Sequence, residues 1–113
     1  MYYRGMKILT PTGVLARFGK ALADPTRASV LLRLKDGAAY SGELAEHVGV
    51  SRQALSNHLA CLRDCGLVVA EPVGRRVRYE LSDPKLAHAL GDLLGAILAV
   101  EPVCSCSVPE CPQ

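Results

Sequence analysis

A short helix, a glycine turn and a capped helix follow one another in the middle of the chain, and they constrain the fold more than any other feature. Residues 43–48 have helical spacing and are stopped by Gly49. Ser51 then opens a longer helix that ends before Gly66. Serine is a favoured residue at the start of a helix, and glycine is favoured just after its end. Two helices joined by such a tight turn predict a helix-turn-helix.

The pattern changes from helical to extended after Gly66. Residues 67–70 are apolar and include two β-branched valines, residues 73–76 form a turn, and residues 77–81 alternate apolar and polar side chains, as in a half-buried strand. A helix-turn-helix followed by a hairpin predicts a winged helix-turn-helix, a mainly α fold with a small β-hairpin (α+β). Further helices are predicted at residues 12–23, at 25–35 after Asp24, and at 84–100 after Asp83.

The helix after Ser51 has one face suited to DNA. Leucines at positions 55, 59 and 62 lie on its apolar side, whereas the opposite side is small, polar and uncharged and fits a major groove. Arginines near the tip of the hairpin suit phosphate contacts. His58 is expected either to pack between helices or to lie close to DNA. The predicted DNA-binding residues are Ser51, Arg52, Gln53, Ser56, Asn57, His58, Arg75, Arg76 and Arg78.

The overall charge of the chain does not by itself indicate whether the protein binds DNA. The chain has 113 residues and a formal net charge of only +2, so the position of the charges carries more information than their sum. A helix-turn-helix pattern can arise by chance, and an arginine-rich hairpin can be a solvated surface. The two features in succession favour DNA binding over this alternative.

The last predicted helix is too apolar for the surface of a small monomer. Its leucines and isoleucine spread over more than one stripe, and small residues recur every four positions. A helix that is apolar all round must be buried. We therefore expect a homodimer through the first and last helices, which would present two recognition helices to a palindromic operator. The alternative is a helix buried within one chain. The predicted interface residues are Leu15, Phe18, Leu90, Leu94 and Ile97.

Five cysteines form two groups. Cys61 and Cys65 lie four residues apart on the predicted recognition helix, a step that places both on one face. Three more, Cys104, Cys106 and Cys111, lie within the last ten residues. The count is odd and no signal-like apolar run precedes them, which predicts a cytoplasmic protein with thiols used for metal binding or redox chemistry. Alternatively, the pair on the helix packs as small apolar side chains.

The chain resembles the ArsR/SmtB family of metal-responsive repressors from about residue 15 to residue 100. The resemblance rests on Ala-Leu-Ala-Asp-Pro-Thr-Arg at 21–27, Ser-Asn-His-Leu-Ala-Cys-Leu-Arg at 56–63 with Gly-Leu-Val at 66–68, and Gly-Arg-Arg-Val-Arg-Tyr at 74–79. It implies a winged-helix homodimer that binds operator double-stranded DNA when metal-free. Binding of the effector would weaken DNA binding and derepress an efflux or detoxification operon.

The sensor site differs between branches of that family. The cysteine motif that the arsenic branch carries before the recognition helix is absent here, and of the ligands of the zinc branch only His88 and Asp92 are present. The pair Cys61 and Cys65 on the predicted recognition helix resembles the cysteine pair of the cadmium- and lead-sensing branch. In that branch, a cysteine from the C-terminal tail of the other subunit completes the site. For this third ligand the spacing favours Cys106, with Cys104 close and Cys111 an extra thiol.

Thiolate ligands favour thiophilic ions. Three sulfurs suit Cd(II) or Pb(II), and they also suit As(III) or Sb(III), whereas Zn(II) usually takes four ligands. The predicted function is a transcriptional repressor released by a thiophilic metal ion as effector. An arsenite- or antimonite-responsive repressor is one alternative, and a thiol redox sensor is another.

Several functions are not expected. The sequence has no phosphate-binding glycine loop, paired carboxylates or nucleophile–base pair, so neither an enzyme nor a small organic substrate is predicted. The most apolar segment, residues 86–100, is shorter than the roughly 20 residues that span a membrane. The expected organisation is a flexible N-terminal arm (1–11), a winged helix-turn-helix DNA-binding and dimerisation domain (12–100) and a cysteine-rich tail (101–113).

Overall fold

The first two helices begin at side chains that cap them. The computed structural model describes residues 10–98. Helix α1 (Pro11–Leu22) follows Thr10, whose hydroxyl accepts a hydrogen bond from the Gly13 amide at 2.9 Å. Helix α2 (Pro25–Lys35) follows Asp24, whose carboxylate accepts from the Arg27 amide at 2.9 Å. Proline at the first helical position fits both starts. Helix α1 thus takes in Pro11, which was assigned to the N-terminal arm; the rest of that arm, except Thr10, lies outside the described residues.

A two-residue strand precedes the helix-turn-helix and was not predicted. Strand β1 (Ala39–Tyr40) pairs with the later hairpin through Ala39 opposite Tyr79 and Tyr40 opposite Arg78. Helix α3 (Ser41–Val48) follows directly, and the Tyr40 amide donates to the Glu43 carboxylate at 2.8 Å. This contact fixes the start of α3 two residues before the predicted position 43.

The predicted wing is present and longer than expected. Helix α4 (Arg52–Asp64) leads into strands β2 (Val68–Val73) and β3 (Arg76–Leu81), which pair antiparallel around the two-residue turn Gly74-Arg75. Gly74 has a φ of +62°, a conformation that glycine adopts without strain. The sheet order is β1-β3-β2. These elements confirm the winged helix-turn-helix fold of α helices with a small sheet.

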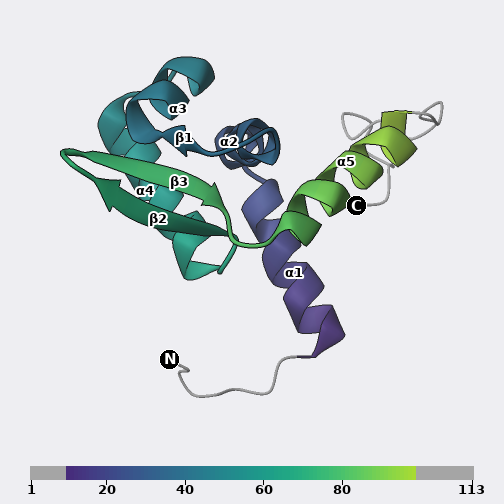
Figure 1. The fold of residues 1–113 in the computed structure, drawn as a ribbon. Coiled ribbons are helices and arrows are strands. Elements are labelled where there is room, and N and C mark those ends of the chain that lie inside the picture. The colour runs from purple at the N-terminus through teal and green to yellow at the C-terminus, as the bar shows by residue number, and fades with distance from the viewer. Residues whose placement is uncertain (1–9, 99–113) are drawn as a thin grey trace.

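The core lies where α2, α3 and α4 meet the sheet (Figure 1). It is aliphatic, and Tyr79 is the single aromatic side chain among the buried residues of the described chain. Burial of these side chains removes apolar surface from water, which is the main favourable contribution to folding. The buried residues are Ala21, Val30, Leu31, Leu34, Ala39, Leu44, Ala45, Leu55, Leu59, Leu62, Leu67, Val68, Tyr79 and Leu90.

Helices α1 and α5 (Pro84–Leu98) extend away from this core (Figure 1). Helix α5 packs on α2 and follows Asp83, whose carboxylate accepts from the Lys85 amide at 2.7 Å. Much of both helices is uncovered: Leu15 is 69% exposed and Ile97 is 61% exposed. The predicted continuation of α5 to residue 100 lies outside the described residues. Within residues 10–98, no helix is long and apolar enough to cross a membrane.

Candidate metal site and nucleic-acid interface

Helix α4 separates an apolar face from a polar one. Leu55, Leu59 and Leu62 are each no more than 2% exposed and hold the helix on the core. Ser51 caps the helix, since its hydroxyl accepts from the Ala54 amide at 3.1 Å. The opposite face, with Gln53, Ser56 and Asn57, is exposed. The amide of Gln53 donates to the side-chain oxygen of Asn57 at 3.3 Å, so these two predicted base-reading residues lie together on the uncovered face.

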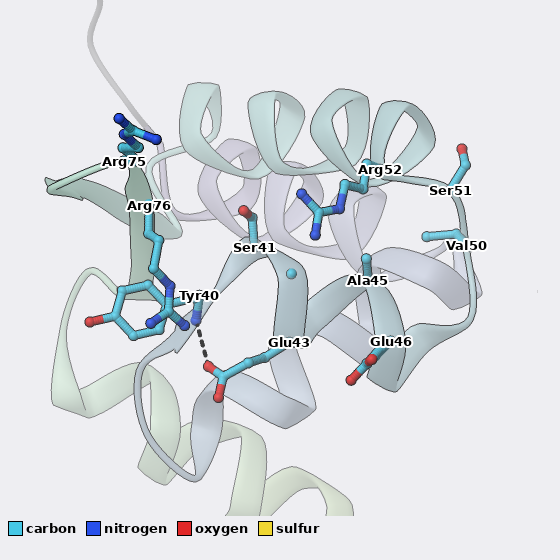
Figure 2. Close-up of a pocket in the computed structure, with 11 residues that line it drawn as sticks. Tyr40, Ser41, Glu43, Ala45, Glu46, Val50, Ser51, Arg52, Arg75 and Arg76 are labelled. Atoms are coloured by element: carbon cyan, nitrogen blue, oxygen red, sulfur yellow. Dashed lines mark hydrogen bonds between the residues drawn. The ribbon is translucent and has the colours of Figure 1, made fainter.

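Three of the four predicted arginines gather around one cavity between α3, the start of α4 and the wing (Figure 2). Arg52 lines it from α4, and Arg75 and Arg76 line it from the hairpin. The guanidinium of Arg76 lies 3.5 Å from the centre of the Tyr40 ring, a cation–π contact that holds the wing against β1. Glu43 and Glu46 also line the cavity, so its net charge is +1, and the three arginines beside an exposed helix face can receive a DNA backbone.

Arg78 differs from the other arginines of the wing. Its guanidinium lies 3.3 Å from the Glu71 carboxylate and 3.5 Å from the Glu80 carboxylate, so it forms ion pairs across and along the hairpin. These exposed contacts are weak. They nevertheless offset the positive charge of Arg78, and its predicted DNA contact stays a prediction.

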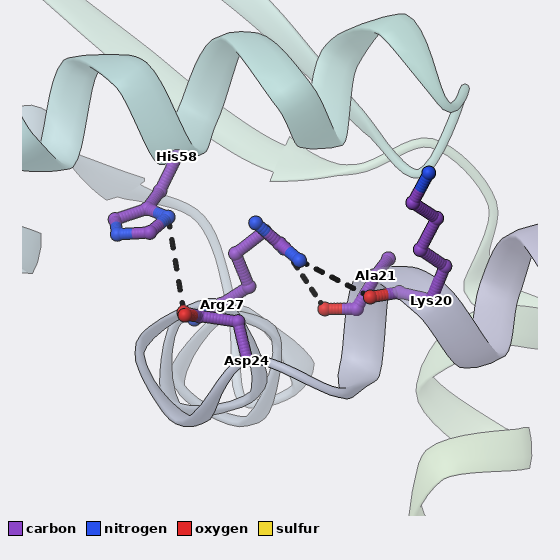
Figure 3. A network of polar contacts seen from close by, with 5 residues as sticks. All are labelled: Lys20, Ala21, Asp24, Arg27 and His58. Carbon is purple, nitrogen blue, oxygen red and sulfur yellow. Dashed lines mark hydrogen bonds and ion pairs between the residues drawn. The ribbon is translucent and has the colours of Figure 1, made fainter.

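His58 turns towards α2 instead of lying on the exposed face of α4. Its Nδ1 atom lies 3.8 Å from the Asp24 carboxylate, and the two side chains are only partly exposed (Figure 3). The pair connects the recognition helix to the cap of α2. This placement agrees with the expectation of a residue that packs between helices, and a contact of His58 with DNA stays a prediction.

Cys61 and Cys65 line one open cavity of about 730 Å³ between α4 and the α1–α2 junction, here called the thiol cavity. Both are free thiols and partly exposed. Burial raises the pKa of the Cys65 thiol, and the adjacent Cys61 raises it further through its charge and a hydrogen bond, whereas Arg17 and Arg27 lower it. The two thiols thus share one cavity and interact with each other, and the pKa of Cys65 lies above its ordinary value.

The rest of the thiol cavity comes from residues that the sequence analysis did not associate with the cysteines. Arg27 donates from Nε to the Ala21 carbonyl and from a terminal nitrogen to the Lys20 carbonyl, both at 3.1 Å (Figure 3). These bonds close the junction between α1 and α2 that forms the far wall. The lining residues are Arg17, Lys20, Ala21, Arg27, Asn57, Ala60, Cys61, Asp64 and Cys65.

The donor chemistry of the thiol cavity fits a thiophilic ion in part. Two adjacent thiols supply two soft ligands. Among residues 10–98, however, no group of three or more His, Cys, Asp or Glu side chains is placed to hold a metal ion. A complete thiolate site needs a further ligand from elsewhere. The predicted tail ligands Cys104, Cys106 and Cys111 lie outside the described residues.

The predicted dimer-interface residues fall into two groups. Leu15, Leu94 and Ile97 are exposed on α1 and α5, and Phe18 is partly buried. Leu90 is 5% exposed and packs in the chain's own core. Between α1 and α5 lies an apolar groove, lined by Val14, Leu15, Arg17, Phe18, Cys65, Leu67, Leu86 and Ala89. The interface stays a prediction, and Leu15, Leu94 and Ile97 are the residues left exposed for it.

Comparisons of sequence agree with this architecture. Residues 24–69 match the bacterial regulatory protein, arsR family. The chain is 59% identical over 87 residues to the HTH-type transcriptional regulator CmtR of Mycobacterium tuberculosis, covering 77% of this chain and 74% of the relative. It is 43% identical over 86 residues to the "Probable mercury resistance operon repressor" of Streptomyces lividans, covering 76% of this chain and 67% of the relative.

Solved structures give the same result. The NMR structure of the cadmium metal-sensor CmtR from Mycobacterium tuberculosis matches with a TM-score of 0.63 and 56% identity, over 84% of this chain and 98% of that one. The homodimeric winged helix-turn-helix DNA-binding domain of Mb0332 from Mycobacterium bovis matches with a TM-score of 0.70 and 28% identity, over 78% and 81%. The expected resemblance is confirmed, and the chain belongs to the arsR family of bacterial regulatory proteins.

Proposed function

We propose that this protein is a transcriptional repressor that binds operator DNA when metal-free and is released when Cd(II) or Pb(II) binds to cysteine thiolates. The observation that carries the proposal is the adjacency of Cys61 and Cys65 in one cavity on the recognition helix. The cadmium sensor CmtR, a 59% identical relative, supports the choice of metal. A regulator of this kind acts in the cytoplasm, where its DNA is.

The repressor would be a homodimer. The homodimeric relative Mb0332 and the exposed apolar side chains of α1 and α5 support this assembly. Two-fold symmetry would place two copies of α4 in successive major grooves, with Gln53, Ser56 and Asn57 towards the bases. Arg52, Arg75 and Arg76 would contact phosphates and fix the position on the duplex. Residues 101–113 would form a cysteine-rich tail beside the winged helix-turn-helix domain.

The tail would complete the metal site. Cys61 and Cys65 offer two thiolates, and Cys106 or Cys104 of the other subunit would supply the third, with Cys111 as a further candidate. Such a connection between subunits would shift the recognition helices relative to each other. An effector changes DNA affinity only through its different affinity for the two arrangements.

Two alternatives predict different effectors. A metalloid-responsive repressor would use the same thiols for As(III) or Sb(III). A redox sensor would need a reactive thiolate, and the raised pKa of the Cys65 thiol disfavours that state. The metal-sensing relatives favour a metal ion, which would displace the thiol protons on binding.

The test is a titration of the reduced protein bound to a fluorescent DNA fragment from upstream of its own gene. Cd(II), Pb(II), As(III) and a thiol oxidant are added in separate experiments, and fluorescence anisotropy and ultraviolet thiolate–metal absorbance are recorded. We expect release by Cd(II) or Pb(II) at about one ion per subunit, the stoichiometry that one three-thiolate site per subunit gives.

Variants and alternative outcomes make this test specific. Cys61→Ser should bind the fragment as the parent does and should not respond to metal. Serine replacements at Cys104, Cys106 and Cys111 identify the tail ligand. Release by As(III) alone would assign the protein to metalloid sensing, and release by the oxidant alone would assign it to redox sensing. Absence of specific DNA binding would refute the repressor proposal.

A further inference from the structure

The wall of the thiol cavity is electropositive. Arg17 and Lys20 line it from α1, and Arg27 lines it from α2. Asp64 supplies the one carboxylate of the lining, so these four side chains leave a net charge of +2 around the two thiols. Because the cavity is open, water screens these charges in part, so the cations closest to the thiols affect them most.

Part of this positive charge is held in place before any ligand binds. Arg27 cannot rotate freely because it donates hydrogen bonds to the carbonyls of Ala21 and Lys20 (Figure 3). Arg17, in contrast, is exposed on α1 and reaches the cavity from the outside. Arg17 and Arg27 line the same cavity as Cys61 and Cys65, so both place a positive charge on the wall of the space that the thiols share.

The candidate effectors form thiolate complexes that differ in charge. A divalent ion that displaces the protons of three thiols gives M(SR)₃⁻ and releases three protons. Arsenous acid, As(OH)₃, reacts with three thiols to give neutral As(SR)₃ and three molecules of water. With three thiolates, the divalent complex therefore carries one negative charge more than the arsenic complex, whereas with two thiolates M(SR)₂ and As(SR)₂OH are both neutral.

We infer that Arg17 and Arg27, which are not metal ligands, are specificity-determining residues that favour Cd(II) or Pb(II) over As(III) by stabilising the extra negative charge of the divalent thiolate complex. The inference rests on the proposed function and goes further, because it assigns the choice of effector to the side of the cavity opposite the cysteines. It also means that thiolate number alone does not set the selectivity.

Arg17→Gln is the most direct test, since it removes one charge from an exposed side chain and leaves the Arg27 hydrogen bonds intact. Arg63→Gln is the matched control. This variant also loses one positive charge, but from α4. Arg63 lies two residues from both Cys61 and Cys65, which places it roughly 200° around the helix from them, and it is not part of the cavity lining. Arg17→Lys restores the charge.

The affinities of each reduced protein for Cd(II) and As(III) are measured separately by competition with a chelator or a dithiol, from the thiolate–ligand absorbance. We expect Arg17→Gln to weaken Cd(II) binding about threefold or more, and to change As(III) binding less than about twofold. Arg63→Gln should change neither, and Arg17→Lys should restore Cd(II) binding. Circular dichroism and size-exclusion chromatography would show that fold and oligomeric state are unchanged.

The result separates this inference from the proposed function. If the parent protein binds Cd(II) through its thiols but Arg17→Gln weakens Cd(II) and As(III) equally, or neither, the charge argument is wrong and the metal site stands. If the parent shows no thiolate–metal absorbance with any of these ions, the proposed function itself fails. An equal loss in Arg63→Gln would also overturn the inference, because the effect would then be one of overall charge.

Discussion

The Nδ1 atom of His58 lies 3.8 Å from the carboxylate of Asp24, so the middle of the recognition helix α4 contacts the N-cap residue of α2. The same carboxylate accepts a hydrogen bond from the Arg27 amide at 2.9 Å. Asp24 therefore stabilises the start of α2 and also contacts α4, and both contacts are stronger when its carboxyl group is ionised.

Lowering the pH should weaken the contacts that Asp24 makes with α2 and α4. The hydrogen bond from the Arg27 backbone, the largest cause, and the charges of His58 and Arg27 hold the pKa of Asp24 below its ordinary value, although desolvation opposes them. A lowered folded-state pKa gives stability that is present above the unfolded pKa, about 3.9, and is lost as the pH falls through the folded value. Thermal melting between pH 6 and pH 2 should show a smaller loss for Asp24→Asn than for the parent. Asp92→Asn, on the exposed part of α5, should follow the parent.

Even the replacement of Arg27 by lysine should lower the stability of the protein. A guanidinium can donate to the carbonyls of Ala21 and Lys20 at the same time, whereas an ammonium group lacks this planar geometry. We expect Arg27→Lys to lower the free energy of unfolding by about 1–2 kcal/mol, as for the loss of one or two hydrogen bonds. Urea unfolding measures this, and an unchanged midpoint would contradict the role of Arg27 at the junction. Arg63→Lys, at an exposed position, should stay within about 0.5 kcal/mol.

The arginines of the wing should contribute unequally to DNA affinity. Arg75 stands in the two-residue turn, whereas Arg78 is already paired with Glu71 and Glu80. Arg75→Ala should weaken binding to every DNA sequence and reduce the slope of log affinity against log salt by about 1. Arg78→Ala should cause a smaller change. Anisotropy titrations at several salt concentrations test this order, and a larger effect of Arg78→Ala would reverse it.

The exposed end of α5 should be necessary for dimerisation. Ile97 is 61% exposed, and a charged side chain there would be costly to bury in an apolar interface. We expect Ile97→Glu to be monomeric in light-scattering experiments and to lose most of its operator affinity, because one recognition helix remains. Lys85→Glu, at the exposed start of the same helix, serves as the control. A dimeric Ile97→Glu variant would place the interface elsewhere.

Local signals account for the parts of the fold that were predicted. The N-caps at Asp24 and Ser51, the glycine turn at Gly49 and the leucine spacing of α4 each act within a few residues. Strand β1 has only two residues, too few for an alternating pattern, and it exists because β3 pairs with it. Pairing also extends β2 through Glu71 and Pro72, which would not favour a strand alone.

The site was predicted only as far as one helix reaches. Spacing on α4 placed Cys61 beside Cys65 and separated the DNA face from the core. The cations opposite those thiols come from α1 and α2, more than 30 positions earlier in the sequence, so no local pattern could associate them. A hint was present in Arg27, which belongs to the Asp-Pro-Thr-Arg segment of the resemblance but had no assigned role.

Cys65 and Arg17 line the thiol cavity and also the apolar groove between α1 and α5. The two spaces therefore share part of their walls, although one is charged and the other is apolar. A ligand in the thiol cavity that moves the Cys65 or Arg17 side chain towards itself therefore also changes the wall of the groove. The shape of the surface between α1 and α5 is thus not independent of what occupies the space behind it.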